Sequence, residues 1–191
     1  MKTDTTNQEF FDGKYRHHTD PWNFANDPYE TGRYQAILNA LAHRRYDRAF
    51  EPGCSIGVLT EKLARICNQV QAMDISSIAV GEARMRCRNL GNVEITRGAL
   101  PEDLPEGPLD LIVFSEVGYY LGEDELQSLG EKLVQRMSQG GVLLAAHWLG
   151  HSADHCLTGD RVHEILETVD GLVHEHRERH AGFRLDRWVR V

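Results

Sequence analysis

No hydrophobic run in the sequence approaches the roughly 18 residues that a membrane span requires, and the polar first ten residues lack the apolar core of a signal peptide. Cysteine is scarce, with four residues and no Cys-x-x-Cys pair, which is typical of proteins kept in a reducing compartment. Basic residues are also in deficit, because 21 Lys and Arg stand against 29 Asp and Glu and give a net charge of −8. We therefore expect a cytoplasmic protein that binds neither nucleic acid nor a membrane surface.

The length of 191 residues, with 41% hydrophobic residues, favours a single domain with its own core. Residues 1–44 begin with a polar stretch that contains several aromatic side chains, and we expect them to form an arm with helices that covers the site. Residues 45–191 are expected to form the body of the protein. No sequence pattern indicates an oligomeric state.

Strand and helix patterns alternate through this body, which is typical of a parallel, doubly wound sheet. The predicted strands are 49–53, 69–75, 93–95, 109–114 and 142–146, followed by a hairpin of 174–180 and 183–191. The predicted helices are 58–67, 77–89, 124–137 and 158–169. The fold class is therefore α/β: a Rossmann-like, seven-stranded, mostly parallel sheet with an antiparallel last strand and helices on both faces.

The loop after the first strand, Glu51-Pro52-Gly53-Cys54-Ser55-Ile56-Gly57, lies where ligands bind in such sheets. A dinucleotide fingerprint would need glycine where Ser55 and Val58 stand, and no P-loop lysine follows. The cofactor is therefore expected to lack a pyrophosphate. Asp74 ends the second strand, where an acidic side chain can accept hydrogen bonds from both hydroxyls of a ribose. Together these features indicate an adenosine joined to an uncharged or zwitterionic group.

The chain here resembles class I S-adenosylmethionine-dependent methyltransferases. Glu51, Gly53 and Gly57 match the first motif of that family, with Ser55 in place of its middle glycine, and Asp74 matches its second acidic position. The resemblance covers residues 45–191 and implies S-adenosylmethionine as cofactor and S-adenosylhomocysteine as product. It also implies that the terminal hairpin supplies strands six and seven.

A narrower resemblance is to NodS-like methyltransferases, and four clusters carry it. They are Asp20-Pro21-Trp22, Tyr29-Glu30-x-x-Arg33-Tyr34, Thr60-Glu61-Lys62-Leu63-Ala64 and Ser115-Glu116-Val117-x-Tyr119-Tyr120-Leu121. That family includes the N-methyltransferase of the free amine of chitooligosaccharide nodulation factors. The resemblance implies a small-molecule or saccharide acceptor, with the amine of an amino sugar or oligosaccharide first. A small-molecule O-methyltransferase and a non-catalytic cofactor-binding module remain alternatives.

The resemblance also implies a set of cofactor contacts. The backbone of Gly53 and Cys54 should line the methionine, Asp74 should hold the ribose, and Ile75 should pack on the adenine. Arg33 is expected to hold the methionine carboxylate. At the adenine edge, backbone groups of Ala99 and Leu100 are expected, with Glu102 or Asp103 as alternatives, and Ser115 is a further expected contact. Trp22 and Tyr29 are expected beside the sulfonium; alternatively they only anchor the arm.

Methyl transfer is an in-line displacement, so positioning of the nucleophile supplies most of the catalysis. Glu116, just past the fourth strand, can orient the acceptor, accept an N–H bond or contact the cofactor ammonium; alternatively it only complements a helix start. Tyr119 and Tyr120 can form the acceptor wall. His147 ends the fifth strand and is a candidate base, with a structural role as the alternative. It begins a run with His151, His155, Cys156 and His163, but Gly150 and polar neighbours predict a loop there, and we expect no metal.

Overall fold

The computed structural model describes residues 7–41 and 44–191, so the ends of the predicted arm, 1–6 and 42–43, lie outside the described residues. Seven strands form one sheet in the order β3-β2-β1-β4-β5-β7-β6. Their bounds are β1 Tyr46–Pro52, β2 Cys67–Asp74, β3 Val93–Arg97, β4 Leu109–Ser115, β5 Met137–Trp148, β6 Leu172–Arg179 and β7 Phe183–Arg190. Strand β7 runs antiparallel to both neighbours, and β1 to β5 pair in parallel, which confirms the predicted fold class.

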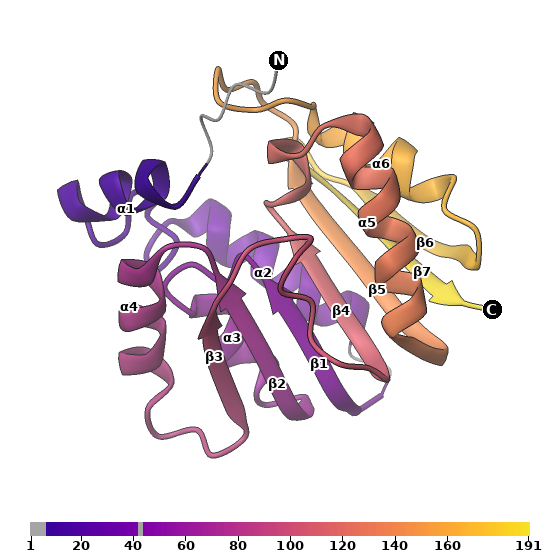
Figure 1. Cartoon of the computed structure of the whole chain (residues 1–191), viewed down its shortest axis with the longest axis horizontal. Coiled ribbons are helices and arrows are strands. Elements are labelled where there is room, and N and C mark those ends of the chain that lie inside the picture. Colours follow the sequence, from indigo (N-terminus) through magenta and orange to yellow (C-terminus); the bar gives the residue numbers. More distant parts are fainter. Residues whose placement is uncertain (1–6, 42–43) are drawn as a thin grey trace.

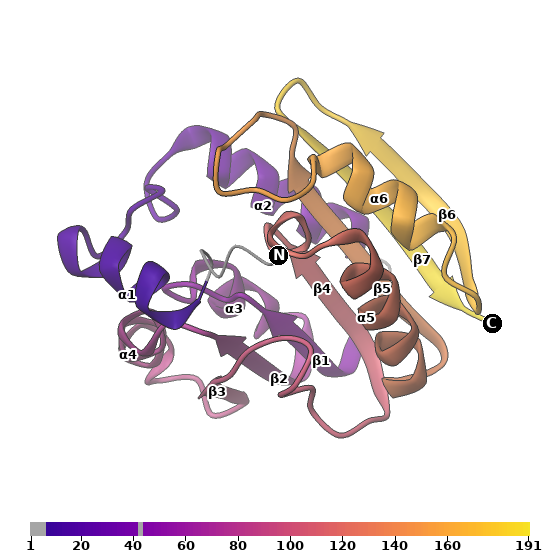
Figure 2. The ribbon, with the colours of Figure 1, turned by 45° about the horizontal axis from the view of Figure 1, so that its top comes forward.

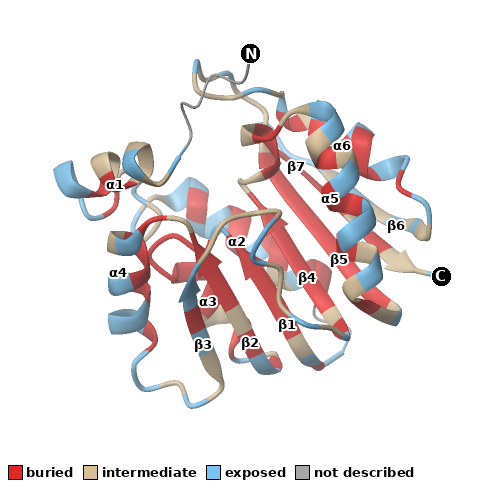
Figure 3. Ribbon diagram, in the orientation of Figure 1, coloured by how far each residue is buried: buried red, intermediate tan, exposed pale blue. Residues whose placement is uncertain are grey.

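Helices cover both faces of this sheet (Figure 1). Their bounds are α1 Gln8–His17, α2 Pro28–Leu41, α3 Val58–Leu63, α4 Ser77–Cys87, α5 Glu123–Arg136 and α6 Gly159–Glu167, with a 3₁₀ turn η1 at Gly118–Tyr120. Side chains alternate along β4: Leu111 and Val113 pack in the cluster with α2 and α3, whereas Ile112 and Phe114 pack in the cluster with α5 and α6. Both faces of the central strands are therefore buried, as Figure 3 shows.

Two element boundaries differ from the sequence-based prediction by four residues or more. The helix after the first loop ends at Leu63 rather than at residue 67, because Cys67 already pairs with Tyr46 as the first residue of β2. Strand β5 begins at Met137, five residues before the predicted strand, because the Gly140-Gly141 pair lies inside the strand. The register shifts there, and Gly140 has a φ of 70°, so the pair forms a bulge instead of a helix stop.

The N-terminal arm lies at the end of the sheet to which the parallel strands point (Figure 1). Its Asp12 is buried and accepts a hydrogen bond from Ser76 Oγ at 2.5 Å, at the N-terminus of α4. This places a carboxylate where the helix dipole favours negative charge. Lys14 pairs with Asp154 of the loop before α6 at 3.3 Å, and Figure 2 shows α1 and that orange loop at the same end of the molecule. None of the helices in the described ranges has the length and apolar character to cross a membrane.

Candidate active site

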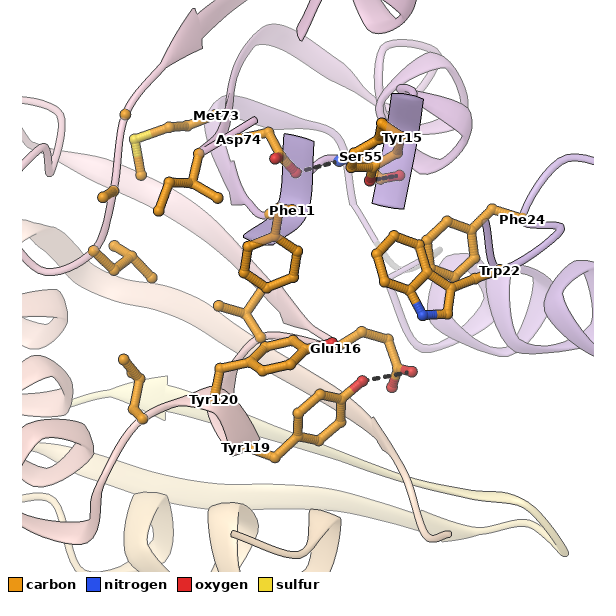
Figure 4. Close-up of a pocket in the computed structure, with 17 residues that line it drawn as sticks. Phe11, Tyr15, Trp22, Phe24, Ser55, Met73, Asp74, Glu116, Tyr119 and Tyr120 are labelled. Carbon is orange, nitrogen blue, oxygen red and sulfur yellow. Dashed lines mark hydrogen bonds between the residues drawn. The ribbon is translucent and has the colours of Figure 1, made fainter. Parts of the chain in front are cut away.

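A pocket with a cavity volume of about 170 Å³ opens at the carboxyl edge of the sheet, between the arm and the body. A smaller hollow adjoins it and shares Phe24, Gly53, Ser55 and Glu116 as lining residues. Figure 4 shows Asp74 and Ser55 at one end of the main pocket and Glu116 and Tyr119 at the other. The pocket is thus elongated between two polar ends.

Three residues of the first loop have positive φ: Gly53 at 71°, Ser55 at 50° and Gly57 at 78°. A Cβ at Gly53 would lie 2.2 Å from Cγ2 of Val117, and one at Gly57 would lie 3.1 Å from Ala83. These two positions therefore require glycine for both conformation and space. Ser55 adopts the left-handed conformation that its glycine counterpart would adopt in the family motif.

Asp74 lies directly beneath this loop. Its Oδ2 accepts a hydrogen bond from Ser55 N at 2.8 Å, and its Oδ1 accepts one from Ser76 N at 2.9 Å. Burial raises the pKa of Asp74 to about 6, against the opposing effect of these backbone donors. Each carboxylate oxygen can accept more than one hydrogen bond, so both can still receive a ribose hydroxyl. Ile75 follows and lines the pocket.

The turn after β3 supplies one side of the pocket through Gly98, Ala99 and Leu100. The N–H of Ala99 already donates to Asp103 Oδ2 at 2.9 Å. The N–H of Ala99 is thus engaged within the turn, while the predicted backbone contact of Ala99 with the cofactor stays a prediction. Asp103 shapes the turn without lining the pocket. Met73 also lines this side, which the sequence-based prediction missed.

The smaller hollow is lined by four predicted site residues, Glu51, Cys54, Ser115 and Arg33. Glu51 accepts a hydrogen bond from Thr60 Oγ1 at 2.6 Å, and burial raises the pKa of Glu51 to about 8. Arg33 is 1% exposed and hydrogen-bonds to Glu30. Its Nε has no hydrogen-bond partner among the described residues. A buried donor without a partner beside a hollow is a suitable place for an anion.

Glu116 connects this hollow to the main pocket. Its Oε2 lies 2.7 Å from Nη1 of Arg33 and accepts a hydrogen bond from the hydroxyl of Tyr119 at 3.0 Å. Its Oε1 accepts a hydrogen bond from Trp148 N at 2.7 Å. Burial first, and then the charge of Glu116, hold the pKa of Tyr119 well above its usual value, so the phenol stays protonated. Tyr120 lines the same pocket, and its ring contacts Phe11 edge to face at 5.2 Å.

Two predicted site residues lie elsewhere. His147 is fully buried behind the pocket, where its Nε2 accepts a hydrogen bond from Gly118 N at 3.0 Å. Burial holds the pKa of His147 well below its usual value, and the residue does not line the pocket, so the prediction of an acceptor-facing base is wrong. Tyr29 does not line either cavity; its ring packs edge to face on Phe183 at 6.1 Å. Tyr29 thus anchors the arm to β7, the alternative that the sequence left open.

The histidine-rich stretch after β5 forms a loop up to Thr158, as predicted. Within residues 7–41 and 44–191, no group of three His, Cys, Asp or Glu side chains is arranged to hold a metal ion. His147 instead lies 3.1 Å from His163, and His155 stacks on the ring of Tyr119 at 3.8 Å.

Three aromatic residues of the arm line the main pocket in addition to the predicted Trp22: Phe11, Tyr15 and Phe24. The hydroxyl of Tyr15 lies 2.6 Å from Oγ of Ser55, so α1 is joined to the first loop. The only sequence signal for these residues is the concentration of aromatic side chains in an otherwise polar segment.

The sheet order, the glycine loop and the carboxylate at the end of β2 define the fold of class I S-adenosylmethionine-dependent methyltransferases. The model of the family described as nodulation protein S (NodS) matches residues 4–166, and the chain belongs to this family. Nodulation protein S of Rhizobium tropici is 32% identical over 127 residues, which are 65% of this chain and 53% of that protein. The chain therefore spans about half the length of the curated relatives it matches.

Solved structures agree with this assignment. A Pseudomonas syringae protein assigned as a methyltransferase is 34% identical, with a TM-score of 0.75 over 85% of this chain and 99% of that one. The N-methyltransferase NodS of Bradyrhizobium japonicum WM9, in complex with S-adenosyl-L-homocysteine, has a TM-score of 0.83 at 23% identity, over 96% of this chain and 98% of that one. At 23% identity, the likeness to the Bradyrhizobium japonicum protein shows that the two chains share a fold.

Proposed function

We propose that the protein is an S-adenosylmethionine-dependent methyltransferase that transfers a methyl group to the amine of a small molecule or saccharide, most specifically an amino sugar or oligosaccharide. The observation that carries the proposal is the hydrogen bond from the Tyr119 hydroxyl to Glu116, at the opposite end of the pocket from Asp74. One end of the pocket can then hold a nucleoside, while the other presents a phenol oxygen to an acceptor. Membership of the NodS family supports the same chemistry.

The residues present fit the cofactor at each of its groups. Asp74 can accept from the ribose hydroxyls, and Ile75 can pack against the adenine. Arg33, whose Nε has no partner among the described residues, lines the smaller hollow and could neutralise a carboxylate there. Glu51 lines the same hollow and could accept a hydrogen bond from an ammonium group. Gly53 lines both the pocket and the smaller hollow, so its backbone can lie alongside the methionine. When bound, S-adenosylmethionine supplies an electrophilic methyl group on its sulfonium.

An amine acceptor fits the polar end of the pocket. Because the Tyr119 hydroxyl donates its proton to Glu116, the lone pairs of its oxygen can accept an N–H bond from an incoming amine. That contact would orient the nitrogen lone pair away from Tyr119 and toward the methyl site. A neutral amine needs positioning rather than a strong base, and the proton is lost only after transfer.

An O-methyltransferase is the less favoured alternative. A hydroxyl acceptor would need a base to remove its proton near neutral pH. Glu116, which lines the pocket, is already paired with Arg33. His147 lies behind the pocket wall with both ring nitrogens engaged. A saccharide acceptor is favoured by the aromatic faces of Trp22 and Tyr120, which also line the cavity.

Calorimetry with S-adenosylhomocysteine, followed by a methyl-transfer assay, tests the proposal. The acceptors should be a chitooligosaccharide with one free amine, its fully N-acetylated counterpart as the matched control, and a simple phenol. We expect micromolar-range cofactor binding, on the order of −8 kcal/mol, and transfer only to the free amine. Transfer to the phenol alone would establish the O-methyltransferase, and binding without any transfer would establish a cofactor-binding module. Failure to bind the cofactor would remove all three.

We propose a cytoplasmic location as well. All four cysteines are free, and Cys54, Cys67 and Cys87 are buried as thiols. Burial raises the pKa of Cys54 well above its usual value, so this thiol is unreactive and needs no oxidising partner. Four unpaired thiols are typical of proteins from reducing compartments. Detection of a disulfide in the purified native protein would contradict this.

A further inference from the structure

A line of buried hydrogen bonds extends from the turn η1 to β7, behind the pocket. Gly118 N donates to Nε2 of His147 at 3.0 Å, and Nδ1 of His147 lies 3.1 Å from Nε2 of His163. Nδ1 of His163 lies 2.7 Å from Oδ2 of Asp186. All three side chains, which come from β5, α6 and β7, have exposed fractions of 0%. We call this series the His147–His163–Asp186 relay.

The direction of every proton in the relay follows from its two ends. A backbone N–H can only donate, so Nε2 of His147 must be the unprotonated nitrogen and its Nδ1 must carry the hydrogen. That hydrogen is donated to His163, whose Nε2 is then the acceptor and whose Nδ1 carries the hydrogen. An ionised Asp186 can only accept, which closes the series without a conflict. Both imidazoles are therefore neutral and in the Nδ1–H form.

Asp186 is held as an anion by several donors at once. Besides His163, its carboxylate accepts hydrogen bonds from Arg184 Nε at 2.6 Å, Arg177 Nε at 2.7 Å and His174 Nε2 at 2.8 Å. Burial opposes ionisation, but the hydrogen bonds from these neighbours lower the pKa of Asp186. Because these donors keep Asp186 ionised, its carboxylate can only accept a hydrogen bond from His163. It therefore determines the tautomer of His163.

The other end of the relay supports a strained part of the pocket. Glu116 has a φ of 60°, which a residue with a side chain adopts only when its surroundings impose it. Two residues later, a Cβ at Gly118 would lie 3.0 Å from Nε2 of His147 and 2.5 Å from Val162, so the turn lies directly on the imidazole and on α6. The hydrogen bond from Gly118 is thus positioned to keep this backbone in place.

We propose that the His147–His163–Asp186 relay is a positioning device that holds the turn from Glu116 to Tyr120, and with it the Tyr119–Glu116 pair, in the geometry that methyl transfer to the acceptor needs. The part of this inference that concerns the acceptor rests on the proposed function. The three relay residues touch neither the cavity nor any reacting atom, so they are positioning residues. Their effect reaches the pocket through the backbone of Gly118 and through the edge-to-face contact of His147 with Tyr119.

Protonation of either imidazole would break the relay. A proton added to Nε2 of His147 would face the N–H of Gly118, and one added to Nε2 of His163 would face the N–H of His147. Burial of both rings opposes these protonations, and at His163 it outweighs the opposite effect of Asp186 on the pKa. The charged and titratable groups around the two rings are Arg33, Tyr119 and His155 near His147, and Asp160, Arg184 and Asp186 near His163.

Nitrogen-15 NMR of the unmodified protein tests the relay directly. We expect both buried imidazoles to show the Nδ1–H signature, which is the less common form of free histidine, and to keep it from pH 8 to pH 5.5. An Nε2–H or doubly protonated signal for His147 or His163 at neutral pH would overturn the inference. No acceptor is needed, so the result is independent of the proposed function.

Two variants at one position test the link to the turn. His147→Gln keeps an oxygen near the place of Nε2, whereas His147→Leu removes the acceptor for Gly118 N–H. We expect amide exchange at Gly118 to rise sharply in His147→Leu and to stay close to the original rate in His147→Gln. The acceptor kcat/KM should fall by about tenfold to a hundredfold in His147→Leu, since small misplacements of reacting groups cost this much, while the Kd for S-adenosylhomocysteine stays within about twofold.

Leu166→Ala, in α6 but outside the relay, is the control for a general loss of stability. It should leave Gly118 exchange unchanged relative to the rest of η1. Equal exchange at Gly118 in His147→Leu and His147→Gln would overturn the inference, as would a loss of kcat/KM in Leu166→Ala equal to that in His147→Leu. If no variant and not even the unmodified protein transfers methyl groups, the proposed function fails and the exchange result still decides the relay.

Discussion

Nη1 of Arg33 lies 2.7 Å from Oε2 of Glu116, and this contact joins the N-terminal arm to the end of β4. Arg33 belongs to α2 and is 1% exposed, and it also hydrogen-bonds to Glu30 one turn earlier. Burial raises the pKa of Glu30 to about 7 although the charge of Arg33 opposes this shift. One guanidinium therefore serves two carboxylates, and the arm and the acceptor end of the pocket share a single charged network.

Replacement of this guanidinium should cost both stability and cofactor binding. In Arg33→Met, Glu30 and Glu116 lose their cationic partner inside the protein, and we expect a decrease of about 3–5 kcal/mol in the free energy of unfolding. Arg33→Lys should lose less, because a single ammonium cannot reach both carboxylates in the planar geometry of the fork. Urea denaturation measures both variants. Arg161→Met, which removes an exposed pair with Glu123, is the control and should change little. Equal losses for Arg33→Met and Arg161→Met would contradict the prediction.

The raised pKa of Asp74 predicts that cofactor binding depends on pH. Ribose hydroxyls donate to the ionised carboxylate, so affinity for S-adenosylhomocysteine should be constant above pH 7 and fall below pH 6, by about tenfold per pH unit once the group is mostly protonated. Asp74→Ala should weaken binding by about 2–4 kcal/mol, from the loss of two hydrogen bonds to a charged group, and should remove this slope. Calorimetry from pH 5 to pH 8 checks both effects. A slope that survives in Asp74→Ala would assign the titration to another group.

The raised pKa of Asp74 has the opposite effect on folding stability as the pH changes. The pKa of Asp74 is about 6 in the folded protein against its usual value of 3.8, so the folded state binds the proton more tightly. The contribution of Asp74 to stability is therefore present below about pH 4 and is lost as the pH rises toward 6. Burial of this carboxylate thus lowers the stability of the protein. It places the carboxylate where it can accept hydrogen bonds from the hydroxyls of a ribose.

The sequence predicts those parts of the site that follow strand ends, because a parallel sheet brings all such ends to one edge. The glycine loop, Asp74 and the Glu116–Tyr120 turn are each readable from a few consecutive residues. The direction in which a single side chain at a strand end points cannot be read from a few consecutive residues. His147 follows Leu143 and Ala145 in the two-residue alternation of β5, and these pack on the face covered by α5 and α6. That places His147 on the α6 side, but the sequence alone does not tell which side faces the ligand.

Contacts between distant segments were also beyond sequence-based prediction. The contact between Asp12 and Ser76 spans 64 residues, and the contact between His163 and Asp186 depends on the antiparallel register of β7 beside β5. The glycine pair within β5 was mistaken for a helix stop because its local signal is the same in both settings. The seven strands were all predicted, β6 and β7 with the help of the turn signal at Ala181-Gly182 between them, while strand boundaries depended on pairing partners.

The phenol of Tyr119 should matter for turnover more than for cofactor binding. Tyr119→Phe keeps the ring and its packing on His155 but removes the hydrogen bond to Glu116 and the oxygen that would meet the acceptor. We expect kcat for an amine acceptor to fall by about tenfold to a hundredfold, with the Kd for S-adenosylhomocysteine within about twofold. Tyr46→Phe removes a buried hydroxyl at the opposite end of the sheet and should leave kcat unchanged. Unaltered turnover in Tyr119→Phe would mean that the acceptor binds elsewhere.

Ser55 offers a test of how the arm is attached. Ser55→Gly relieves the cost of a side chain at positive φ, about 1 kcal/mol, but loses a hydrogen bond to Tyr15 of similar value, so the free energy of unfolding should change little. Ser55→Ala keeps the strain and loses the bond, and should destabilise by about 1–2 kcal/mol. Both variants should increase amide exchange in α1, because both detach Tyr15 from the loop. Exchange in α1 that rises in only one of the two variants would show that backbone strain, rather than the Tyr15–Ser55 bond, controls the docking of the arm.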